Sequence, residues 1–219
     1  MRLGIFGGTF NPIHLAHLRC AEEAREALAL DRVLFVPAAI PPHKQNRHVA
    51  AAAHRLAMVR LSIGRHPQFR VSAVELGRSG RSYSVDTLRI LRARLPGTHF
   101  TFLLGLDAFR EIDTWKEYPA LFALTDLAVL SRPPHPLAAG RAALPVAARR
   151  HFCYGRDRRT LVHESGNRIR FLRVTALDIS ASDIRLRVQR GESIRYLVVP
   201  AVERYIHRHR LYRRGSQPR

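Results

Sequence analysis

The sequence has little cysteine and no long apolar run. Its 219 residues include only Cys20 and Cys153, which are too few for a disulfide framework and lack the C-x-x-C spacing. No uninterrupted apolar stretch approaches the roughly 18 residues that a membrane-spanning helix needs. The chain begins with a strand-like segment and not with a basic stretch and a long apolar run, so no secretory signal is expected. These absences predict a soluble cytoplasmic protein with no membrane partner.

Acidic residues are also scarce. Asp and Glu total 17 against 37 Lys and Arg, which gives a formal net charge of +20. Lysine occurs only at Lys44 and Lys116, and the arginines are scattered, with some clustering in residues 204–214. No RNA-binding aromatic signature or zinc-finger spacing accompanies them, so no specific nucleic-acid partner is expected. The charge indicates an arginine-rich solvated surface that would steer an anionic small substrate, while a general attraction to polyanions stays open.

Short apolar runs alternate with amphipathic segments along most of the chain. Strands are expected at residues 2–6, 32–36, 69–74, 100–106, 126–130 and 169–174, and helices at 15–28, 50–63 and 84–95. This rhythm is typical of a doubly wound parallel sheet, so the sequence predicts a Rossmann-like α/β fold. Residues 133–168 break the rhythm and are interpreted as a helical or loop insertion. We predict a nucleotide-binding catalytic domain over 1–178 and a small C-terminal helical subdomain over 179–219.

The most informative segment is Gly-Gly-Thr-Phe-Asn-Pro-Ile-His-Leu-Ala-His at residues 7–17, directly after the apolar run 3–6. Open α/β sheets bind ligands at the carboxyl ends of their strands. Gly7 and Gly8 allow the backbone to approach a phosphate closely, and the following helix start supplies N–H donors. His14 and His17 are three residues apart, so they project from one face of that helix start. Two imidazoles there could stabilise charge that develops on a triphosphate.

Other interpretations of this segment stay open. A Gly-Gly turn is common in doubly wound folds, and the two histidines could be structural or half of a metal site, although no H-E-x-x-H motif is present. The spacings of the Walker A loop and of the dinucleotide-binding G-x-G-x-x-G motif are both absent, which disfavours an ordinary kinase or dehydrogenase. The whole string favours phosphate binding.

A second motif spans residues 178–185, Asp-Ile-Ser-Ala-Ser-Asp-Ile-Arg. Ser180 and Ser182 are residue types that cap helices, and Asp183 would lie in the first turn of the helix that follows. A guanidinium such as that of Arg185 suits bidentate phosphate contact. A plain helix cap with a solvated arginine is the alternative.

The two motifs together resemble the nucleotidyltransferase superfamily with the H-x-G-H signature, and within it the nicotinate-mononucleotide adenylyltransferases. The first string departs from the family pattern at Asn11, where many relatives carry Asp, and at Ala16, where the glycine of the signature stands. The extra methyl of Ala16 should be tolerated, and an amide at residue 11 should not harm phosphate binding. The second motif resembles I-S-x-(S/T)-x-I-R, in which the helix start and the arginine bind the β- and γ-phosphates.

Segments between the two motifs extend the resemblance over nearly the whole chain. They are Pro-Pro-His-Lys at 41–44, Ser-Tyr-Ser-Val-Asp-Thr-Leu at 82–88, Gly-Leu-Asp at 105–107, the segment around Trp115, Ser-Arg-Pro at 131–133 and the stretch 193–200. The resemblance is weakest in 133–168. Each segment also has a plainer interpretation, such as a surface lysine, a helix cap, a core tryptophan or a strand-ending turn.

The resemblance implies an enzyme that transfers AMP from ATP to nicotinate mononucleotide, with Mg²⁺ held mainly by substrate oxygens and water and no protein metal site. It implies three groups of residues: catalytic His14, His17, Arg185 and Lys44; ATP-binding Gly7, Gly8, Thr9, Phe10, Gly105, Asp107, Arg132, Ile179, Ser180 and Ser182; and mononucleotide-binding Asn11, Tyr83, Ser84, Thr87 and Trp115. Another adenylyl- or cytidylyltransferase of the superfamily, or an arginine-rich nucleic-acid-binding module, is the alternative. Preference for the nicotinate over the nicotinamide form, and assembly into a homo-oligomer, stay open.

Overall fold

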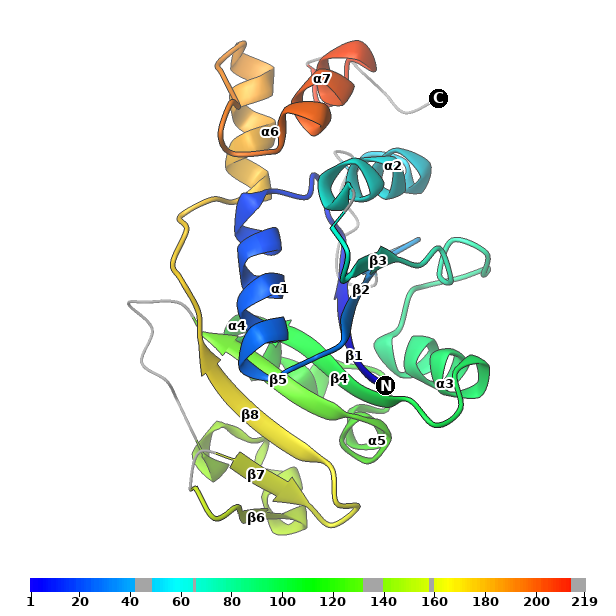
Figure 1. Cartoon of the computed structure of the whole chain (residues 1–219), viewed down its shortest axis with the longest axis vertical. Coiled ribbons are helices and arrows are strands. Elements are labelled where there is room, and N and C mark those ends of the chain that lie inside the picture. The colour runs from blue at the N-terminus through cyan, green and yellow to red at the C-terminus, as the bar shows by residue number, and fades with distance from the viewer. Residues whose placement is uncertain (42–48, 65, 132–139, 158–159, 214–219) are drawn as a thin grey trace. The chain divides into compact units, whose positions relative to one another are not determined.

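A computed structural model describes residues 1–41, 49–64, 66–131, 140–157 and 160–213 (Figure 1). Within these residues, eight strands form one sheet in the order β3-β2-β1-β4-β5-β8-β7-β6. The strands are β1 Arg2–Gly8, β2 Arg32–Pro37, β3 Phe69–Val71, β4 His99–Gly105, β5 Asp126–Ser131, β6 Phe152–Tyr154, β7 Thr160–His163 and β8 Arg168–Arg173. Strands β1, β4, β5 and β8 pair in parallel, which confirms the predicted α/β class with a largely parallel sheet.

Helices connect the strands from β1 to β5, and further helices follow β8. They are α1 Leu15–Ala27, α2 Ala52–Ile63, α3 Ser84–Arg94, α4 Leu106–Arg110, α5 Tyr118–Leu124, α6 Ala181–Arg190 and α7 Pro200–Arg208, with short 3₁₀ turns at Ile112–Thr114, Arg141–Ala143 and Val146–His151. None of the helices in the described part of the chain is both long and apolar enough to cross a bilayer.

The region after β5 differs from its sequence-based interpretation as a helical or loop insertion. Besides two 3₁₀ turns it contains β6 and β7, which pair with each other in antiparallel register, and β7 also pairs antiparallel with β8. Phe152 and Leu161 are the buried apolar residues that attach this hairpin to the core. Strands of three and four residues are too short to show a period of two, so the sequence did not reveal them.

Contacts divide the chain into two compact units, each assembled from three segments. The first unit comprises residues 1–7, 20–34 and 83–176, and the second comprises residues 8–19, 35–82 and 177–219. The proposed boundary at residue 178 stays a prediction.

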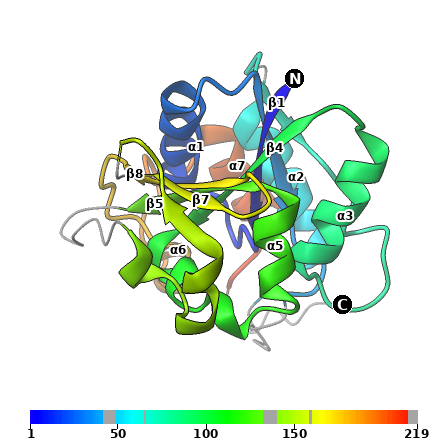
Figure 2. The same cartoon turned by 90° about the horizontal axis from the view of Figure 1, so that it is seen from below.

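The core of the first unit is the parallel part of the sheet. Every residue of β5 is buried, as expected for a parallel strand that is covered on both faces. Helix α3 packs against α5, and the two lie next to each other in both views (Figures 1 and 2). The carboxylate of Asp126 accepts the N–H of Arg168 at 2.8 Å, which ties the starts of β5 and β8 together.

The second unit is built around α2, which packs against β3 and α7. The rings of Phe35 and Phe69 meet edge to face, with centroids 5.2 Å apart. Helix α7 starts with Pro200, whose fixed φ suits a first helical position, and it buries Val202 and Ile206. This unit contains the first motif from Gly8 onward and the whole of the second motif.

Candidate active site

The turn after β1 is shaped by the ring of Phe10. This residue has φ of 48°, a left-handed conformation that is uncommon for a side chain other than glycine. Its ring is buried against the edge of the His17 ring, at 5.2 Å, and near Phe35, at 5.9 Å. A Cβ on Gly8 would lie only 3.0 Å from the Phe10 ring, so a larger residue there would force the ring to shift. Gly7, Gly8 and Thr9 are half-buried in this turn.

The two histidines of the first motif lie together at the start of α1. Their ring centroids are 3.7 Å apart, with His14 buried and His17 half-buried. The backbone N–H of His14 donates to Nδ1 of His17 at 3.2 Å. Since Nδ1 accepts, the neutral His17 ring must carry its proton on Nε2. This nitrogen is therefore a hydrogen-bond donor, as contact with a phosphate oxygen requires.

The second motif reaches the first through Arg185. Its Nη1 donates to the carbonyl oxygen of Asn11 at 2.8 Å, and its Nη2 donates to Oγ of Ser182 at 3.1 Å. Burial lowers the pKa of the Arg185 guanidinium, but an arginine stays protonated. A fixed positive charge is therefore held against the turn of the first motif.

The start of α6 has the cap that its sequence predicts. Ser180 Oγ accepts the N–H of Asp183 at 3.0 Å, which satisfies one of the donors left open at a helix start. Ile179 is half-buried just before this cap, and Ser182 is exposed.

Asn11 is buried and connects three parts of the second unit. Its Oδ1 accepts the N–H of Ala50 at 3.0 Å and the hydroxyl of Tyr212 at 2.9 Å. Burial raises the pKa of Tyr212, which keeps the phenol protonated as a donor. The backbone carbonyl of Asn11 also accepts the hydrogen bond from Arg185. Asn11 therefore lies where α6, the start of α2 and the C-terminal segment meet. Its expected contact with a mononucleotide stays a prediction.

Apart from Asn11, the residues expected on the mononucleotide side lie in the first unit. Tyr83 is the N-cap residue of α3 and Ser84 its first residue, and the hydroxyl of the buried Thr87 donates to the carbonyl of Tyr83 at 3.3 Å. Trp115 is half-buried, with its ring edge-on to Phe102 at 6.2 Å.

Lys116 joins these two segments. Its Nζ lies 5.1 Å from the centre of the Tyr83 ring and 3.1 Å from a carboxylate oxygen of Asp86. The α3 start and the tryptophan segment, separate in sequence, are therefore neighbours in the fold.

For the remaining predicted residues, the structure gives a position in the fold but no contact that bears on their predicted role. Gly105 ends β4 and Asp107 is exposed in the first turn of α4, as expected for an acid at the end of a strand. Ser131 is the last residue of β5. Lys44 and Arg132 lie outside the described residues, so their predicted roles are untested.

Comparison with known proteins identifies the family. The model of the cytidylyltransferase-like family matches residues 5–187. A protein of Syntrophotalea carbinolica named "Probable nicotinate-nucleotide adenylyltransferase" is 50% identical over 213 residues, covering 97% of this chain and 98% of the relative. A protein of the same name from Citrifermentans bemidjiense is 52% identical over 212 residues, with the same coverage. The chain belongs to the nicotinate-nucleotide adenylyltransferase family.

A solved member of the nicotinate-nucleotide adenylyltransferases shares this fold. It is the Plasmodium falciparum nicotinic acid mononucleotide adenylyltransferase, a structure complexed with NaAD, which superposes with a TM-score of 0.74. The match covers 96% of this chain and 97% of the other at 18% identity, and it supports the fold alone. Membership of the nicotinate-nucleotide adenylyltransferase family makes the chain a nucleotidyltransferase.

One buried residue near the glycine turn of this protein was not singled out from the sequence. Arg55 is 1% exposed, and its guanidinium donates to the carbonyl oxygens of Thr9, Ala38, Ala39 and Ala50. In the sequence it is one arginine among many. The available signal was its place on α2, four residues before Val59 and eight before Ile63, on the face that is otherwise apolar.

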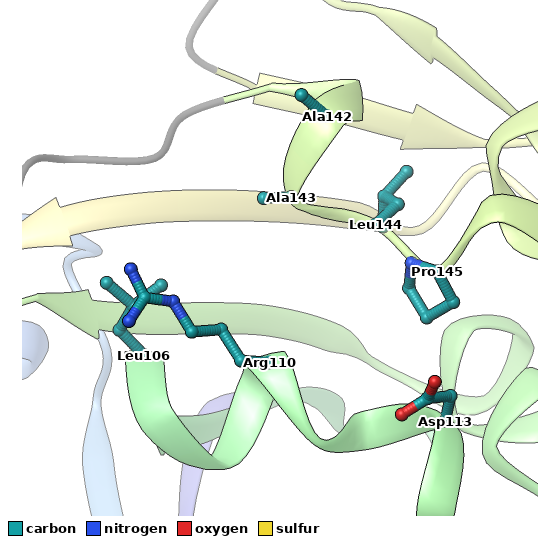
Figure 3. Close-up of a pocket in the computed structure, with 7 residues that line it drawn as sticks. All are labelled: Leu106, Arg110, Asp113, Ala142, Ala143, Leu144 and Pro145. Carbon is teal, nitrogen blue, oxygen red and sulfur yellow. The ribbon is translucent and has the colours of Figure 1, made fainter.

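A cavity of about 320 Å³ lies elsewhere in the first unit of this adenylyltransferase-family fold (Figure 3). Leu106 and Arg110 project into it from α4, Asp113 lies beyond them, and residues 142–145 face them from the other side. None of its lining residues is a predicted site residue. Within the described residues, no group of three or more His, Cys, Asp or Glu side chains is placed to hold a metal ion.

Proposed function

We propose that this protein transfers AMP from ATP to nicotinate mononucleotide, forming nicotinate adenine dinucleotide and pyrophosphate in NAD biosynthesis. The observation that carries the proposal is the bond between Arg185 and the Asn11 carbonyl, which joins the arginine to the turn that carries the histidine pair. Relatives about half identical over nearly the full length of the chain, and named for this reaction, support the choice of substrates.

The reaction requires positioning and charge stabilisation rather than a nucleophilic side chain. A phosphate oxygen of the mononucleotide attacks the α-phosphorus of ATP in line. The bond from that phosphorus to the α,β-bridging oxygen breaks, and its electrons leave with pyrophosphate. The protein holds the reacting groups in line and stabilises the charge that develops on the phosphoryl oxygens.

The residues of the second unit suit the ATP side of this reaction. His17 offers the Nε2 proton and His14 lies against it, so this pair would contact the α- and β-phosphates. Arg185, with Lys44, would contact the leaving pyrophosphate. The remaining ATP contacts are proposed for the glycine turn, the start of α6, Gly105, Asp107 and Arg132.

The mononucleotide is proposed to use residues of the first unit. Trp115 would stack on the pyridine ring, while Tyr83, Ser84 and Thr87 would read its carboxylate through hydroxyl and backbone groups. Asn11, in the second unit, would add a contact to the mononucleotide.

Mg²⁺ fits this site as an ion that is brought in by the phosphates. The side chains described around the glycine turn are imidazoles, guanidinium groups and an amide, which suit phosphate oxygens rather than a hard cation. Mg²⁺ would therefore be held mainly by substrate oxygens and water, and it would neutralise triphosphate charge. The role of His14, His17 and Arg185 is to bind and orient the phosphates.

The deciding experiment is incubation of the protein with ATP, Mg²⁺ and one acceptor at a time, followed by measurement of pyrophosphate release. Nicotinate mononucleotide should support turnover, and the nicotinamide form should be used less well. Pantetheine phosphate tests the nearest alternative within the superfamily, and CTP with an alcohol phosphate tests a cytidylyltransferase. Turnover with either of these, and none with a pyridine mononucleotide, would overturn the proposal.

Replacement of His17 tests the proposed chemistry. We expect His17→Ala to lower kcat by at least ~100-fold with little change in KM, because a donor that stabilises transition-state charge is lost. His207→Ala is the matched control, since His207 is an exposed histidine of the same unit, in α7. Near-normal kcat in His17→Ala would contradict the assignment.

A further inference from the structure

Among the described residues, Arg55 is the most completely buried charged side chain that the proposed reaction does not use. Its Nε donates to Ala50 O at 2.9 Å, and its Nη2 donates to Ala39 O at 2.8 Å. Its Nη1 donates both to Thr9 O, at 2.9 Å, and to Ala38 O. Four of the five guanidinium N–H donors are therefore used, each on a backbone carbonyl.

Removing a guanidinium from water lowers the free energy of unfolding unless its hydrogen bonds compensate. Burial lowers the pKa of Arg55, which reflects the loss of water around the charge. An apolar side chain of similar volume would fill the same space without that loss. What an apolar side chain could not do is fix the directions of four carbonyls at once.

The carbonyl of Thr9 is the important one, because it belongs to the peptide that precedes Phe10. A trans peptide is planar, so its C=O and N–H point in opposite directions. With the Thr9 oxygen directed at Arg55, the N–H of Phe10 points away from the guanidinium. A flip of this peptide would reverse that direction and break the bond to Arg55.

The Phe10 side of the same peptide is also held. Phe10 has a left-handed φ of 48°. Its ring contacts His17 and Phe35 and lies over Gly8, where there is no Cβ, and this packing maintains the conformation. Conformations of this kind persist only where the surroundings determine them, and they concentrate at functional sites. The ring packing fixes one side of the peptide, and Arg55 fixes the other.

The other partners of Arg55 place a second segment against the turn. Ala38 and Ala39 follow β2, and the N–H of Ala38 donates to Gly8 O at 2.9 Å. Because Arg55 holds the carbonyls of both residues, the segment after β2 and the glycine turn share one anchor.

We propose that Arg55 is a positioning residue that orients the Thr9–Phe10 peptide, so that the Phe10 N–H faces the phosphates of bound ATP. This inference rests on the proposed function. It adds to the residues expected from the sequence one that contacts no substrate and acts through the backbone of the turn.

The test uses Arg55→Met, which keeps much of the side-chain volume and removes the donors. Arg60→Met is the matched control, since Arg60 is exposed on the same helix. We expect a fall in kcat of roughly 100-fold for Arg55→Met, as for other displacements of a catalytic group by about 1 Å, with a smaller change in KM for the mononucleotide. Circular dichroism and thermal unfolding establish that both variants are folded. Arg55→Lys, which keeps a cation with fewer donors, should fall between wild type and Arg55→Met, and it provides the test if Arg55→Met does not fold.

A second readout follows the Phe10 N–H itself. In protein labelled with ¹⁵N-phenylalanine, the Phe10 amide resonance should shift when Mg²⁺ and a non-hydrolysable ATP analogue are added to wild type or Arg60→Met. In the Arg55 variants this shift should be lost or strongly reduced. Wild-type kcat in a folded Arg55→Met variant, or an unchanged Phe10 shift in the Arg55 variants, would overturn the inference. If the wild type makes no dinucleotide but its Phe10 resonance still depends on Arg55, only the proposed choice of acceptor fails.

Discussion

Single residues in the second unit combine structural and chemical roles. Asn11 stands where the motif that the first string resembles also allows Asp, and the structure gives its amide oxygen two donors, the Ala50 N–H and the Tyr212 hydroxyl. A carboxylate oxygen at this position could accept the same two hydrogen bonds. The two residue types are therefore compatible with the same local structure.

Loss of the Tyr212 hydroxyl should be measurable as loss of stability. Tyr212→Phe leaves the buried Asn11 Oδ1 with one donor fewer, and a hydrogen bond of this kind contributes about 1 kcal/mol to the free energy of unfolding. Urea unfolding of wild type and variant gives the difference. Tyr196→Phe is the matched control, since Tyr196 is 81% exposed and should change the free energy of unfolding little. Equal effects in the two variants would contradict this role for Tyr212.

Sequence reasoning found the residues whose signal is local. The spacing of His14 and His17 predicts that they share a helix face, and the rings do lie together. The cap at Ser180 is likewise local, because its partner Asp183 is only three residues further along the chain. Arg55 gave only the signal of its place on an apolar helix face, and Tyr212 gave none, because their partners Thr9 and Asn11 are 46 and 201 residues away in the sequence.

At the scale of elements, α2 and α7 meet through aromatic and imidazole side chains. Nδ1 of His54 lies 2.9 Å from the hydroxyl of Tyr205, and the His54 ring is 5.2 Å from that of His209. Burial, and then the charge of His209, lower the pKa of His54 below its usual 6.5. The fold thus favours the neutral form of this ring.

This preference predicts how stability changes with pH. A histidine whose pKa is lowered on folding adds its full stability above about pH 6.5, where it is neutral in both states, and that stability is lost as the pH falls through the folded pKa. We expect the fall in Tm between pH 7 and pH 5 to be smaller in His54→Gln than in wild type. The fall should not vanish, because burial also lowers the pKa of His163. His207→Gln should follow wild type, and an unchanged fall in His54→Gln would contradict the prediction.

The order of the strands could not be predicted from the sequence. The parallel strands could be predicted because each one is a short apolar run within a single segment, as in the fully buried β5. Which strands pair depends on contacts between distant segments. The β6–β7 hairpin was missed because its strands are short and each contributes few buried side chains.

At the scale of the molecule, the charge of +20 is the dominant property. ATP and nicotinate mononucleotide are anions, so the field of the protein should raise their rate of association. We expect the association rate constant of a fluorescent ATP analogue, measured by stopped flow, to fall several-fold between 20 and 200 mM KCl, since salt screens exposed charges beyond a Debye length of roughly 10 Å at 0.1 M. The dissociation rate should change less. An uncharged adenosine analogue is the control, and an association rate of the ATP analogue that does not depend on salt would contradict steering.

The same charge allows a test of the nucleic-acid alternative. Titration of an oligonucleotide at increasing salt reports the number of phosphates neutralised, through the slope of log K against log salt. Weak binding that is blind to sequence is expected for a scattered arginine surface. Tight binding with a steep slope would instead indicate a second role for the arginines.

The single tryptophan gives this protein an optical property of its own. Trp115 is half-buried against Phe102, so the emission of the whole chain at indole wavelengths comes from one ring in a defined environment. If a nicotinate ring stacks on it as proposed, electron transfer from the excited indole would quench that emission. Occupancy by the mononucleotide could then be titrated without a label, without ATP and without turnover, which would separate binding of the acceptor from the chemistry that follows.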